Sequence, residues 1–406
     1  MDIFDKFDLH AGVIDDLLDG DSQRLSPLGI QIDEVRSATD AMIDGKPVIL
    51  AGTNNYLGLT FDPRCIKAAC DATEAHGTGT TGSRVANGTY SGHRALEKEI
   101  ADYLDRRAAI VFSTGYQANL AVLSGLGGPS DFIFIDADSH ASIYDSCKLS
   151  SATVIRFKHN DPADLDKRLA RLDPEHTNKL VVVEGIYSMI GDRAPLAEMV
   201  EVKRRHNAYM VLDEAHSLGV LGRNGRGLAE ETEVEDDVDF VVGTFSKSLG
   251  AVGGFCASNH PKFEMLRVAA RPYVYTASLP PSIIASVHAA VRLIRAEPEL
   301  RTRLWRNVGA LYNSLVDMGF TLCSEMSPII AIAVPTPKEA MRLWSELLAN
   351  GVYVNLMVPP ATPANLSLLR CSVSAAHTEV QIEAICKAFE TVAKSMGVAP
   401  RKAPAG

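Results

Sequence analysis

The sequence contains neither a long apolar run nor an excess of positive charge. No stretch of 18 consecutive apolar residues occurs in the 406-residue chain, so we expect no membrane-spanning helix. The net charge of −10 argues against a nucleic-acid-binding surface, because such a surface needs a basic stripe. The N-terminal residues show no signal-peptide apolar core and no Arg-rich transit pattern. We therefore expect a cytoplasmic protein, with a peripheral position at the inner membrane face as the alternative.

The cysteines show no pairing pattern. There are seven of them, an odd number, and no Cys-x-x-Cys pair occurs. A disulfide framework is therefore not expected, and reduced thiols in a cytosolic protein are the simplest interpretation. The hydrophobic content of 46% and the charged content of 22% are ordinary for a globular protein. At roughly 150 residues per domain, the length predicts two or three domains.

Short apolar runs alternate with amphipathic helical stretches between about residues 50 and 280. Continuous apolar strands separated by helices predict an α/β fold with a mainly parallel sheet covered on both faces. The seven predicted strands are Ala108–Ser113, Phe132–Asp136, Thr153–Phe157, Leu180–Glu184, Tyr209–Asp213, Phe240–Gly243 and Gly254–Ala257.

Four parts are expected along the chain. The first ~45 residues mix charge with Leu and Ile at helical spacing, which predicts an arm or a leading helix. After the segment TASLPPS come the helical patterns Ile283–Ala296 and Arg301–Met318. Strand-like runs follow at Ile329–Val334, Val352–Asn355 and Leu368–Val373, and indicate a small α+β domain. The predicted bounds are 1–50 for the arm, 51–285 for the large domain, 286–398 for the small C-terminal domain and 399–406 for a tail.

Polar residues follow one apolar run in the segment VVGTFSKSLGAVGGF. Ligands of open α/β sheets bind outside the carboxyl ends of the strands, so these residues are candidates for chemistry. A lysine at Lys247, just past a buried strand, is partly desolvated, which lowers its pKa and frees the amine for Schiff-base chemistry. The hydroxyls of Thr244 and Ser246 suit a phosphate. Taken alone, the segment is more typical of a solvated lysine in a flexible turn.

A second run, in YMVLDEAHSLGVLG, leads into Asp213 and His216. An aspartate at a strand end can hold a pyridinium nitrogen protonated, and this pairing makes pyridoxal phosphate (PLP) an electron sink. His216 would reach the phenolic oxygen of the ring or the substrate. The pattern alone also fits a helix N-cap or a pair of metal ligands. Because no further His or Cys pattern supports a metal, none is expected.

Two further segments place polar groups after strands. FIFIDADSHASIYD puts His140 where a flat imidazole can stack on a cofactor ring, although a structural histidine is the alternative. VFSTGYQANL starts a helix at Gly115, and backbone N–H groups at a helix start form an anion site for a phosphate. All four segments follow an apolar run, as expected if ligands bind outside the carboxyl ends of the strands, a relation called the strand-end rule below.

The order and spacing of Asp213, His216 and Lys247 resemble fold-type-I PLP enzymes, specifically the α-oxoamine synthases. The resemblance covers the chain from roughly residue 10 to residue 395. The stretches that resemble the members acting on L-serine are DADSHASIYD, RFKHND, EGIYSM, VVGTFSKS, RPYVYTASLPPS and PPATPA. The resemblance implies condensation of L-serine with a long-chain acyl thioester, with loss of CO2, to give 3-oxo-sphinganine in the first step of sphingolipid biosynthesis.

The resemblance also implies a role for each cofactor-site residue. Lys247 would hold PLP as the internal aldimine, and Asp213 would pair with the pyridine nitrogen. His216 would contact the phenolic oxygen, and His140 would stack on the ring. The residues expected to line the cofactor and its phosphate are Gly115, Tyr116, Thr244 and Ser246.

Substrate and partner residues follow from the same resemblance. Arg370, in LLRCS, would bind the amino-acid carboxylate, and Asn55 would lie near the substrate. A homodimer with shared active sites is expected, in which Thr276 and Ser278 reach the phosphate of the neighbouring subunit. The thioester carrier is either coenzyme A or acyl carrier protein.

Three alternatives remain open. Some relatives carry an arginine in the proline-rich segment where this chain has Met357 and Val358, so a second contact to the substrate carboxylate is missing or comes from elsewhere. The amino acid could therefore also be glycine or alanine, as in sister enzymes. A catalytically silent partner subunit is a second alternative, against which the presence of Lys247 argues. For an acidic acyl carrier protein, Arg267 and Arg271 are candidates for a basic patch, although a solvated charged face is the simpler interpretation.

Overall fold

The structure is a computed structural model that describes residues 2–7, 29–173 and 178–396. The chain divides into two compact units. The larger unit comprises Asn54–Ser188 and Asp192–Leu304, and the smaller comprises Met1–Thr53, Met189–Gly191 and Trp305–Gly406. The four-part division expected from the sequence stays a prediction.

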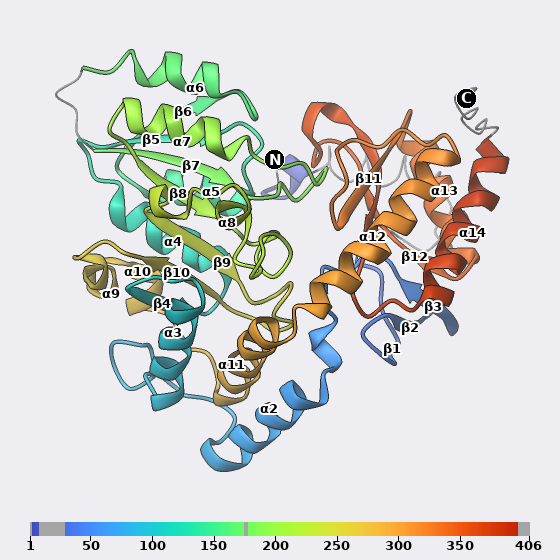
Figure 1. Ribbon diagram of the computed structural model, residues 1–406, viewed down its shortest axis with the longest axis horizontal. Coiled ribbons are helices and arrows are strands. Elements are labelled where there is room, and N and C mark those ends of the chain that lie inside the picture. The colour runs from blue at the N-terminus through green and yellow to red at the C-terminus, as the bar shows by residue number, and fades with distance from the viewer. Residues whose placement is uncertain (1, 8–28, 174–177, 397–406) are drawn as a thin grey trace. The chain divides into compact units, whose positions relative to one another are not determined.

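The larger unit is built on a seven-stranded sheet with the order β4-β10-β9-β8-β7-β5-β6 (Figure 1). Its strands are β4 (Ala108–Phe112), β5 (Phe132–Asp136), β6 (Thr153–Phe157), β7 (Lys179–Glu184), β8 (Tyr209–Asp213), β9 (Phe240–Thr244) and β10 (Gly254–Ser258). Only β10 runs antiparallel to its neighbours β4 and β9, and the other pairings are parallel. All seven predicted strands are confirmed, because each apolar run is as long as one buried strand.

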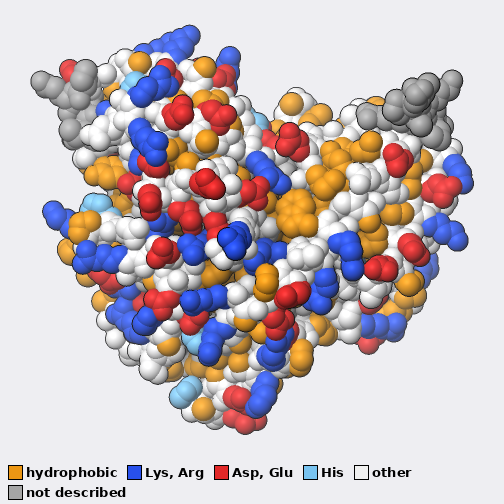
Figure 2. Space-filling view, viewed as in Figure 1, with side chains coloured by type: hydrophobic (Ala, Val, Ile, Leu, Met, Phe, Trp, Pro, Cys, Tyr) orange, Lys and Arg blue, Asp and Glu red, His pale blue; other side chains and the backbone are white. Residues whose placement is uncertain are grey.

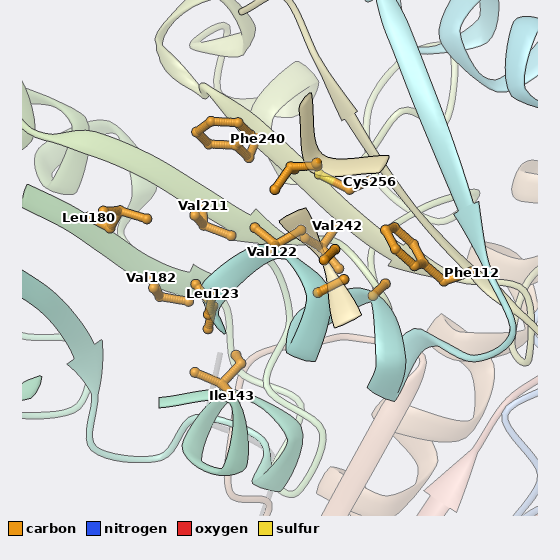
Figure 3. Packing of buried hydrophobic residues seen from close by; sticks show 14 of the residues in the cluster. Phe112, Val122, Leu123, Ile143, Leu180, Val182, Val211, Phe240, Val242 and Cys256 are labelled. Carbon is orange, nitrogen blue, oxygen red and sulfur yellow. The ribbon is translucent and has the colours of Figure 1, made fainter. Parts of the chain in front are cut away.

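Helices cover the sheet of the larger unit. Helix α4 (Gly115–Leu126) packs against β9 and β10, and α5 (Ala141–Leu149) packs beside α4. Figure 3 shows Leu123 of α4 and Ile143 of α5 together with strand side chains such as Val182. These side chains are fully buried, so the core fixes the strands whose carboxyl ends carry the predicted site. The remaining helices of this unit with eight or more residues are α2 (Pro63–His76), α3 (Ser91–Tyr103), α6 (Pro162–Leu169), α7 (Leu196–Arg205) and α11 (Pro281–Ala296).

The smaller unit has two sheets of its own. One has the order β11-β14-β13 and is antiparallel, and the other has the order β1-β2-β3-β12. The strands of the first are β11 (Ile329–Val334), β13 (Asn355–Met357) and β14 (Ser367–Ser372). Its helices are α13 (Pro337–Ala349), α14 (Glu379–Met396) and most of α12 (Glu299–Asp317). The small α+β domain is thus confirmed in kind, but the single predicted strand Val352–Asn355 is wrong, because β12 (Val352–Tyr353) and β13 belong to different sheets.

The helix expected within the first ~45 residues is wrong for residues 29–45, whereas Asp5–Phe7 form a short 3₁₀ helix. Strands β1 (Glu34–Val35), β2 (Asp40–Ile43) and β3 (Lys46–Leu50) form an antiparallel run instead. Asp44 and Gly45 make the turn between β2 and β3 with positive φ values of 50° and 67°. An Asp-Gly pair between short strands is a strong hairpin signal that outweighs the helical spacing. Residues 8–28, where a leading helix was also expected, lie outside the described residues.

The described surface carries charges of both signs. Figure 2 shows Lys and Arg interspersed with Asp and Glu on the face that it draws. In the described ranges, every helix is too short or too polar to cross a membrane. The same ranges hold no group of three or more His, Cys, Asp or Glu side chains suited to a metal ion.

Truncating the core under the site should destabilise the protein strongly. Leu123 is fully buried between α4 and the sheet, so Leu123→Ala should lower the free energy of unfolding by about 2–5 kcal/mol. Leu149 is 68% exposed, so the matched change Leu149→Ala should cost no more than about 0.5 kcal/mol. Urea denaturation followed by circular dichroism measures both. Equal losses in the two variants would contradict the assigned core.

Candidate active site

One cavity of about 260 Å³ lies at the carboxyl ends of the central strands in the larger unit. Eight of the twelve predicted site residues line it, namely Gly115, Tyr116, His140, Asp213, His216, Thr244, Ser246 and Lys247. They come from the segments after β4, β5, β8 and β9, so the strand-end rule correctly predicted that they lie together. Glu184, the last residue of β7, also lines this cavity.

A chain of hydrogen bonds links Asp213 to His140. The Asn119 Nδ2 group donates to Asp213 Oδ2 at 2.7 Å and to Ser142 Oγ at 3.0 Å. Ser142 Oγ in turn lies 2.8 Å from His140 Nδ1. Asp213 Oδ1 accepts the Ala215 N–H at 2.9 Å. Because Asp213 is only 5% exposed, these donors replace the water that its carboxylate would otherwise bind.

His140 is a neutral imidazole with its hydrogen on Nε2. The Ser142 N–H points at His140 Nδ1 over 3.1 Å, so Nδ1 is an acceptor. Burial lowers the pKa of His140, the nearby Asp213 raises it, and Lys247 lowers it, with a net decrease. An uncharged, flat ring is suited to lie against an aromatic cofactor, as the resemblance implies.

Tyr56 holds the second histidine of the cavity. The Tyr56 hydroxyl lies 2.7 Å from His216 Nδ1, and both side chains are buried. Tyr56 belongs to the segment N-Y-L-G-L, 160 residues before His216, and packs at a tilt of 56° to its ring. The phenol therefore fixes the orientation of the imidazole in the cavity wall.

Glu184 is a buried carboxyl group whose pKa is raised, which favours its neutral form. Burial raises its pKa well above the usual value, and the adjacent Asp213 raises it further, since the two residues are register partners on β7 and β8. Glu184 Oε1 accepts the backbone N–H of His140 at 2.5 Å. The raised pKa favours the neutral carboxyl group, which holds the His140 backbone without placing a second negative charge beside Asp213.

A cradle for an anion lies at the start of α4. Thr114 caps the helix by accepting the Gln117 N–H at 3.0 Å, and the first helical N–H groups, of Gly115 and Tyr116, face away from the helix interior. The Thr244 and Ser246 hydroxyls are 2.9 Å apart and line the same cavity. A Cβ atom at Gly115 would come within 2.7 Å of the Thr244 side chain, so only glycine permits this close approach.

Lys247 begins a turn whose backbone is held by hydrogen bonds. Thr244 Oγ1 donates to the Gly253 carbonyl at 2.9 Å, and the Phe245 N–H donates to the same carbonyl at 2.9 Å. The Gly250 N–H closes the turn on the Lys247 carbonyl at 3.0 Å. The half-buried Lys247 therefore starts from a rigid backbone, which removes the flexible-turn alternative.

Four predicted residues do not line this cavity. Thr276 and Ser278 line a separate small cleft of the larger unit, where the Ser278 hydroxyl donates to the Gly88 carbonyl at 2.6 Å. Asn55 is buried and donates to Thr60 Oγ1 at 2.7 Å. Arg370 lies in β14 of the smaller unit, 3% exposed, and donates to Ser372 Oγ at 3.0 Å. Their assigned roles stay predictions.

Sequence reasoning missed several residues of the network. Asn119 and Ser142 lie within helices, where a polar residue at each turn is ordinary and gives no signal. Glu184 is the last residue of a predicted strand, so the strand-end rule itself could have found it. Tyr56 contacts His216 over a sequence distance that no local pattern reveals.

The donor set fits PLP. The cavity combines a primary amine, a buried carboxylate, two imidazoles and a helix N-terminus with hydroxyls beside it. Asn119 Oδ1 is also buried and meets no hydrogen-bond partner among the described residues, so a bound group has an acceptor to satisfy. Lys247, Asp213 and the cradle at Gly115 suit the aldehyde, ring nitrogen and phosphate of PLP respectively.

Comparison with known proteins identifies the family. A family model described as aminotransferase class I and II matches residues 46–389. The chain belongs to this family of PLP-dependent enzymes and, within it, to the α-oxoamine synthases. The expected fold type I is thereby confirmed.

The individual relatives narrow the class further. The chain is 55% identical over 373 residues to a serine palmitoyltransferase of Caulobacter vibrioides, with 92% of each chain covered. It is 49% identical over 399 residues to a serine palmitoyltransferase of Sphingomonas paucimobilis, covering 98% of this chain and 94% of that one. A solved structure of SPT with a PLP internal aldimine superposes with a TM-score of 0.95 at 49% identity and covers 98% of this chain and 100% of that one.

The raised pKa of Glu184 leads to a test with two substitutions. Glu184→Gln keeps a neutral acceptor for the His140 amide, so the protein should keep its fold and its cavity. Glu184→Ala leaves that buried N–H without its acceptor and should lower the free energy of unfolding by about 1–3 kcal/mol. Denaturant titration of both variants measures the difference.

The pH dependence should separate Glu184→Gln from the wild type. Because the folded-state pKa of Glu184 is raised above its ordinary value of 4.5, stability is lost as pH rises above that value. The wild type should therefore lose stability relative to Glu184→Gln as pH increases, whereas the exposed control Glu201→Gln should show no such trend. If Glu184→Gln behaves like Glu184→Ala, the carboxyl group is ionised and the assignment is wrong.

Proposed function

We propose that the chain is a PLP-dependent acyltransferase that condenses L-serine with a long-chain acyl thioester and releases CO2 and a thiol, giving 3-oxo-sphinganine. The observation that carries the proposal is the convergence of Lys247, Asp213, His216 and His140 on one cavity. The identity to serine palmitoyltransferases over nearly the whole chain supports the choice of reaction. The product would enter sphingolipid biosynthesis.

The predicted residues of the cavity would each hold one part of the cofactor. The N–H groups of Gly115 and Tyr116 bind the phosphate, together with the hydroxyls of Thr244 and Ser246. The Asp213 carboxylate keeps a proton on the ring nitrogen, and Asn119 holds that carboxylate in place. The neutral His140 ring lies against the cofactor face, and His216 contacts the phenolic oxygen.

The lysine performs the proton chemistry. When bound, PLP supplies an electron sink for the negative charge that develops at the α-carbon of the amino acid. The Lys247 amine removes the α-proton and returns a proton after CO2 has left. The new carbon–carbon bond joins the α-carbon to the acyl carbonyl carbon, and the thiol leaves with the electrons of the broken carbon–sulfur bond.

Substrate and subunit contacts complete the proposal. Arg370 pairs with the carboxylate of serine through two parallel hydrogen bonds, and Asn55 lies near the substrate. The enzyme is a cytoplasmic homodimer with shared active sites, in which Thr276 and Ser278 contact the phosphate bound by the neighbouring subunit. These assignments rest on the family resemblance.

The carrier of the acyl group is either coenzyme A or acyl carrier protein. The structure contradicts both expectations for Arg267, namely that it belongs to a basic surface patch for a carrier protein and that it is a solvated surface charge. Its side chain is 12% exposed and donates to Glu97 Oε1 at 2.9 Å and Oε2 at 3.0 Å. An acidic carrier protein would therefore need cations other than Arg267.

Removal of Lys247 should abolish both covalent attachment of PLP and turnover. Borohydride reduction of the wild type followed by peptide mapping should place PLP on Lys247. Lys247→Ala should lose this adduct and at least about 10²–10⁴-fold in turnover, because the general base is gone. The control Lys148→Ala, at a side chain that is 75% exposed, should behave as wild type. Reduced PLP on another lysine would refute the assignment.

Arg370→Lys should weaken serine binding while leaving PLP binding intact. A lysine cannot reproduce the planar pair of hydrogen bonds, so the half-saturating serine concentration should rise by about tenfold. Arg342→Lys, at an exposed arginine of the same unit, is the control.

A product assay with serine, glycine and alanine, and with both thioester carriers, settles the amino acid. Serine should condense fastest. Faster condensation of glycine or alanine would assign the chain to a sister activity, and unchanged serine binding in Arg370→Lys would remove the carboxylate role.

A further inference from the structure

His159, in the segment RFKHND, lies between two carboxylates behind the cavity wall. Its Nδ1 is 2.8 Å from Asp136 Oδ1, and its Nε2 is 2.7 Å from Asp192 Oδ2. An ionised carboxylate only accepts hydrogen bonds, so both ring nitrogens must carry a hydrogen. His159 is therefore an imidazolium cation, in contrast to the neutral His140.

Asp136 connects this cation to the loop that carries His140. It ends β5, is fully buried and stands four residues before His140. Its Oδ1 also accepts the Asp138 N–H at 2.8 Å, and its Oδ2 accepts the Asn160 N–H at 2.9 Å. The course of residues 137–139 thus depends on the orientation of the Asp136 carboxylate, and the hydrogen bond from the His159 cation fixes that orientation.

The other side of His159 is equally constrained. Asp192 Oδ2 also accepts the Asn160 Nδ2 group at 2.7 Å, and the Tyr187 N–H donates to the Asp192 carbonyl at 2.9 Å. The Tyr187 ring meets the imidazole edge to face, with centroids 4.6 Å apart. The titratable groups that face His159 are therefore Asp136 and Asp138 after β5, and Tyr187 and Asp192 after β7.

We propose that His159 is a positioning residue for the PLP site, whose charge holds the Asp136–His140 loop so that His140 meets the cofactor with the correct orientation. The inference rests on the proposed function only in that PLP is the ligand. His159 touches neither the cavity nor the cofactor cradle, because it is absent from the cavity lining and acts through Asp136. His159 thereby determines the affinity for PLP and the circular dichroism of the bound cofactor.

The electrostatics of the cluster support this geometry. Burial alone lowers the pKa of His159, but the hydrogen bonds to Asp136 and Asp192 outweigh it and raise the pKa to about 10. Because the folded-state value exceeds the ordinary 6.5, the stability that the cation contributes is fully present below pH 6.5 and is lost as pH rises through 10. The charge is thus retained at neutral pH.

The test compares three variants by equilibrium PLP titration and by visible circular dichroism of the bound cofactor. His159→Gln should weaken PLP binding by about tenfold, by analogy with the loss of a residue that orients a metal-ligating side chain. It should also reduce the dichroism, because His140 is no longer held. The double variant His159→Gln/Asp192→Asn should recover part of the affinity, since it removes one uncompensated carboxylate.

The matched control is His206→Gln. His206 Nε2 pairs with Asp166 Oδ1 at 2.7 Å. The His206 side chain is 20% exposed, against 22% for His159, and neither histidine lines the cavity. PLP binding of this control should equal that of the wild type. Wild-type affinity and dichroism in His159→Gln, or an equal loss in His206→Gln, would overturn the inference. If the wild type itself bound no PLP, the proposed function would fail instead.

Thermal unfolding of the PLP-free chain gives an independent measurement. The difference in stability between wild type and His159→Gln should be at its full size up to pH 6.5 and should shrink as pH approaches 10. If His159→Gln does not fold, Asp192→Asn serves in its place, because it keeps an oxygen acceptor but removes one anion. It should then lower the pH at which the His159 ring titrates by NMR, and an unchanged titration would overturn the pairing.

Discussion

The structure of the candidate site depends on supplying hydrogen-bond donors to one carboxylate, Asp213, in a place almost without water. Burial of a charge is costly unless the charge is paired and hydrogen-bonded. Here the Asn119 amide and the Ala215 N–H supply two donors. Burial and the adjacent Asp213 raise the pKa of Glu184, which favours a carboxyl group without a second negative charge at this position.

The surroundings of His140 and His159 show how one residue type acquires two charge states. His140 receives a backbone N–H at Nδ1 and is buried, so the neutral ring is favoured. His159 meets a carboxylate at each nitrogen, so the cation is favoured in spite of partial burial. The two rings are connected through Asp136 and the loop that follows it. The neutral ring faces the cavity, while the charged ring remains behind it and balances the carboxylates there.

The sequence predicted the sheet and most of the cavity, because both follow from simple patterns. Seven apolar runs of strand length became the seven strands, and the polar residues after them came together at one edge, as parallel strands require. The residues that hold these side chains were not predicted. Asn119 and Ser142 give no periodic signal, and the pairing of Tyr56 with His216 depends on tertiary packing alone. The hairpin at Asp44 and Gly45 shows the reverse case, in which a local turn signal was present but helical spacing was followed instead.

Helix α4 holds both ends of the proposed cofactor at once. Its first residue, Gly115, begins the cradle for the phosphate, and Asn119, four residues later, reaches the carboxylate assigned to the ring nitrogen. With a rise of about 1.5 Å per residue, the two positions are separated along the axis by about 6 Å, a spacing that the backbone hydrogen bonds of the helix keep constant. This helical turn therefore fixes the distance between the phosphate cradle and the residue that holds Asp213. Any movement of α4 along its axis would shift the phosphate cradle and the Asn119 amide in the same direction. The affinity for the phosphate and the position of the carboxylate at the ring nitrogen therefore cannot change independently.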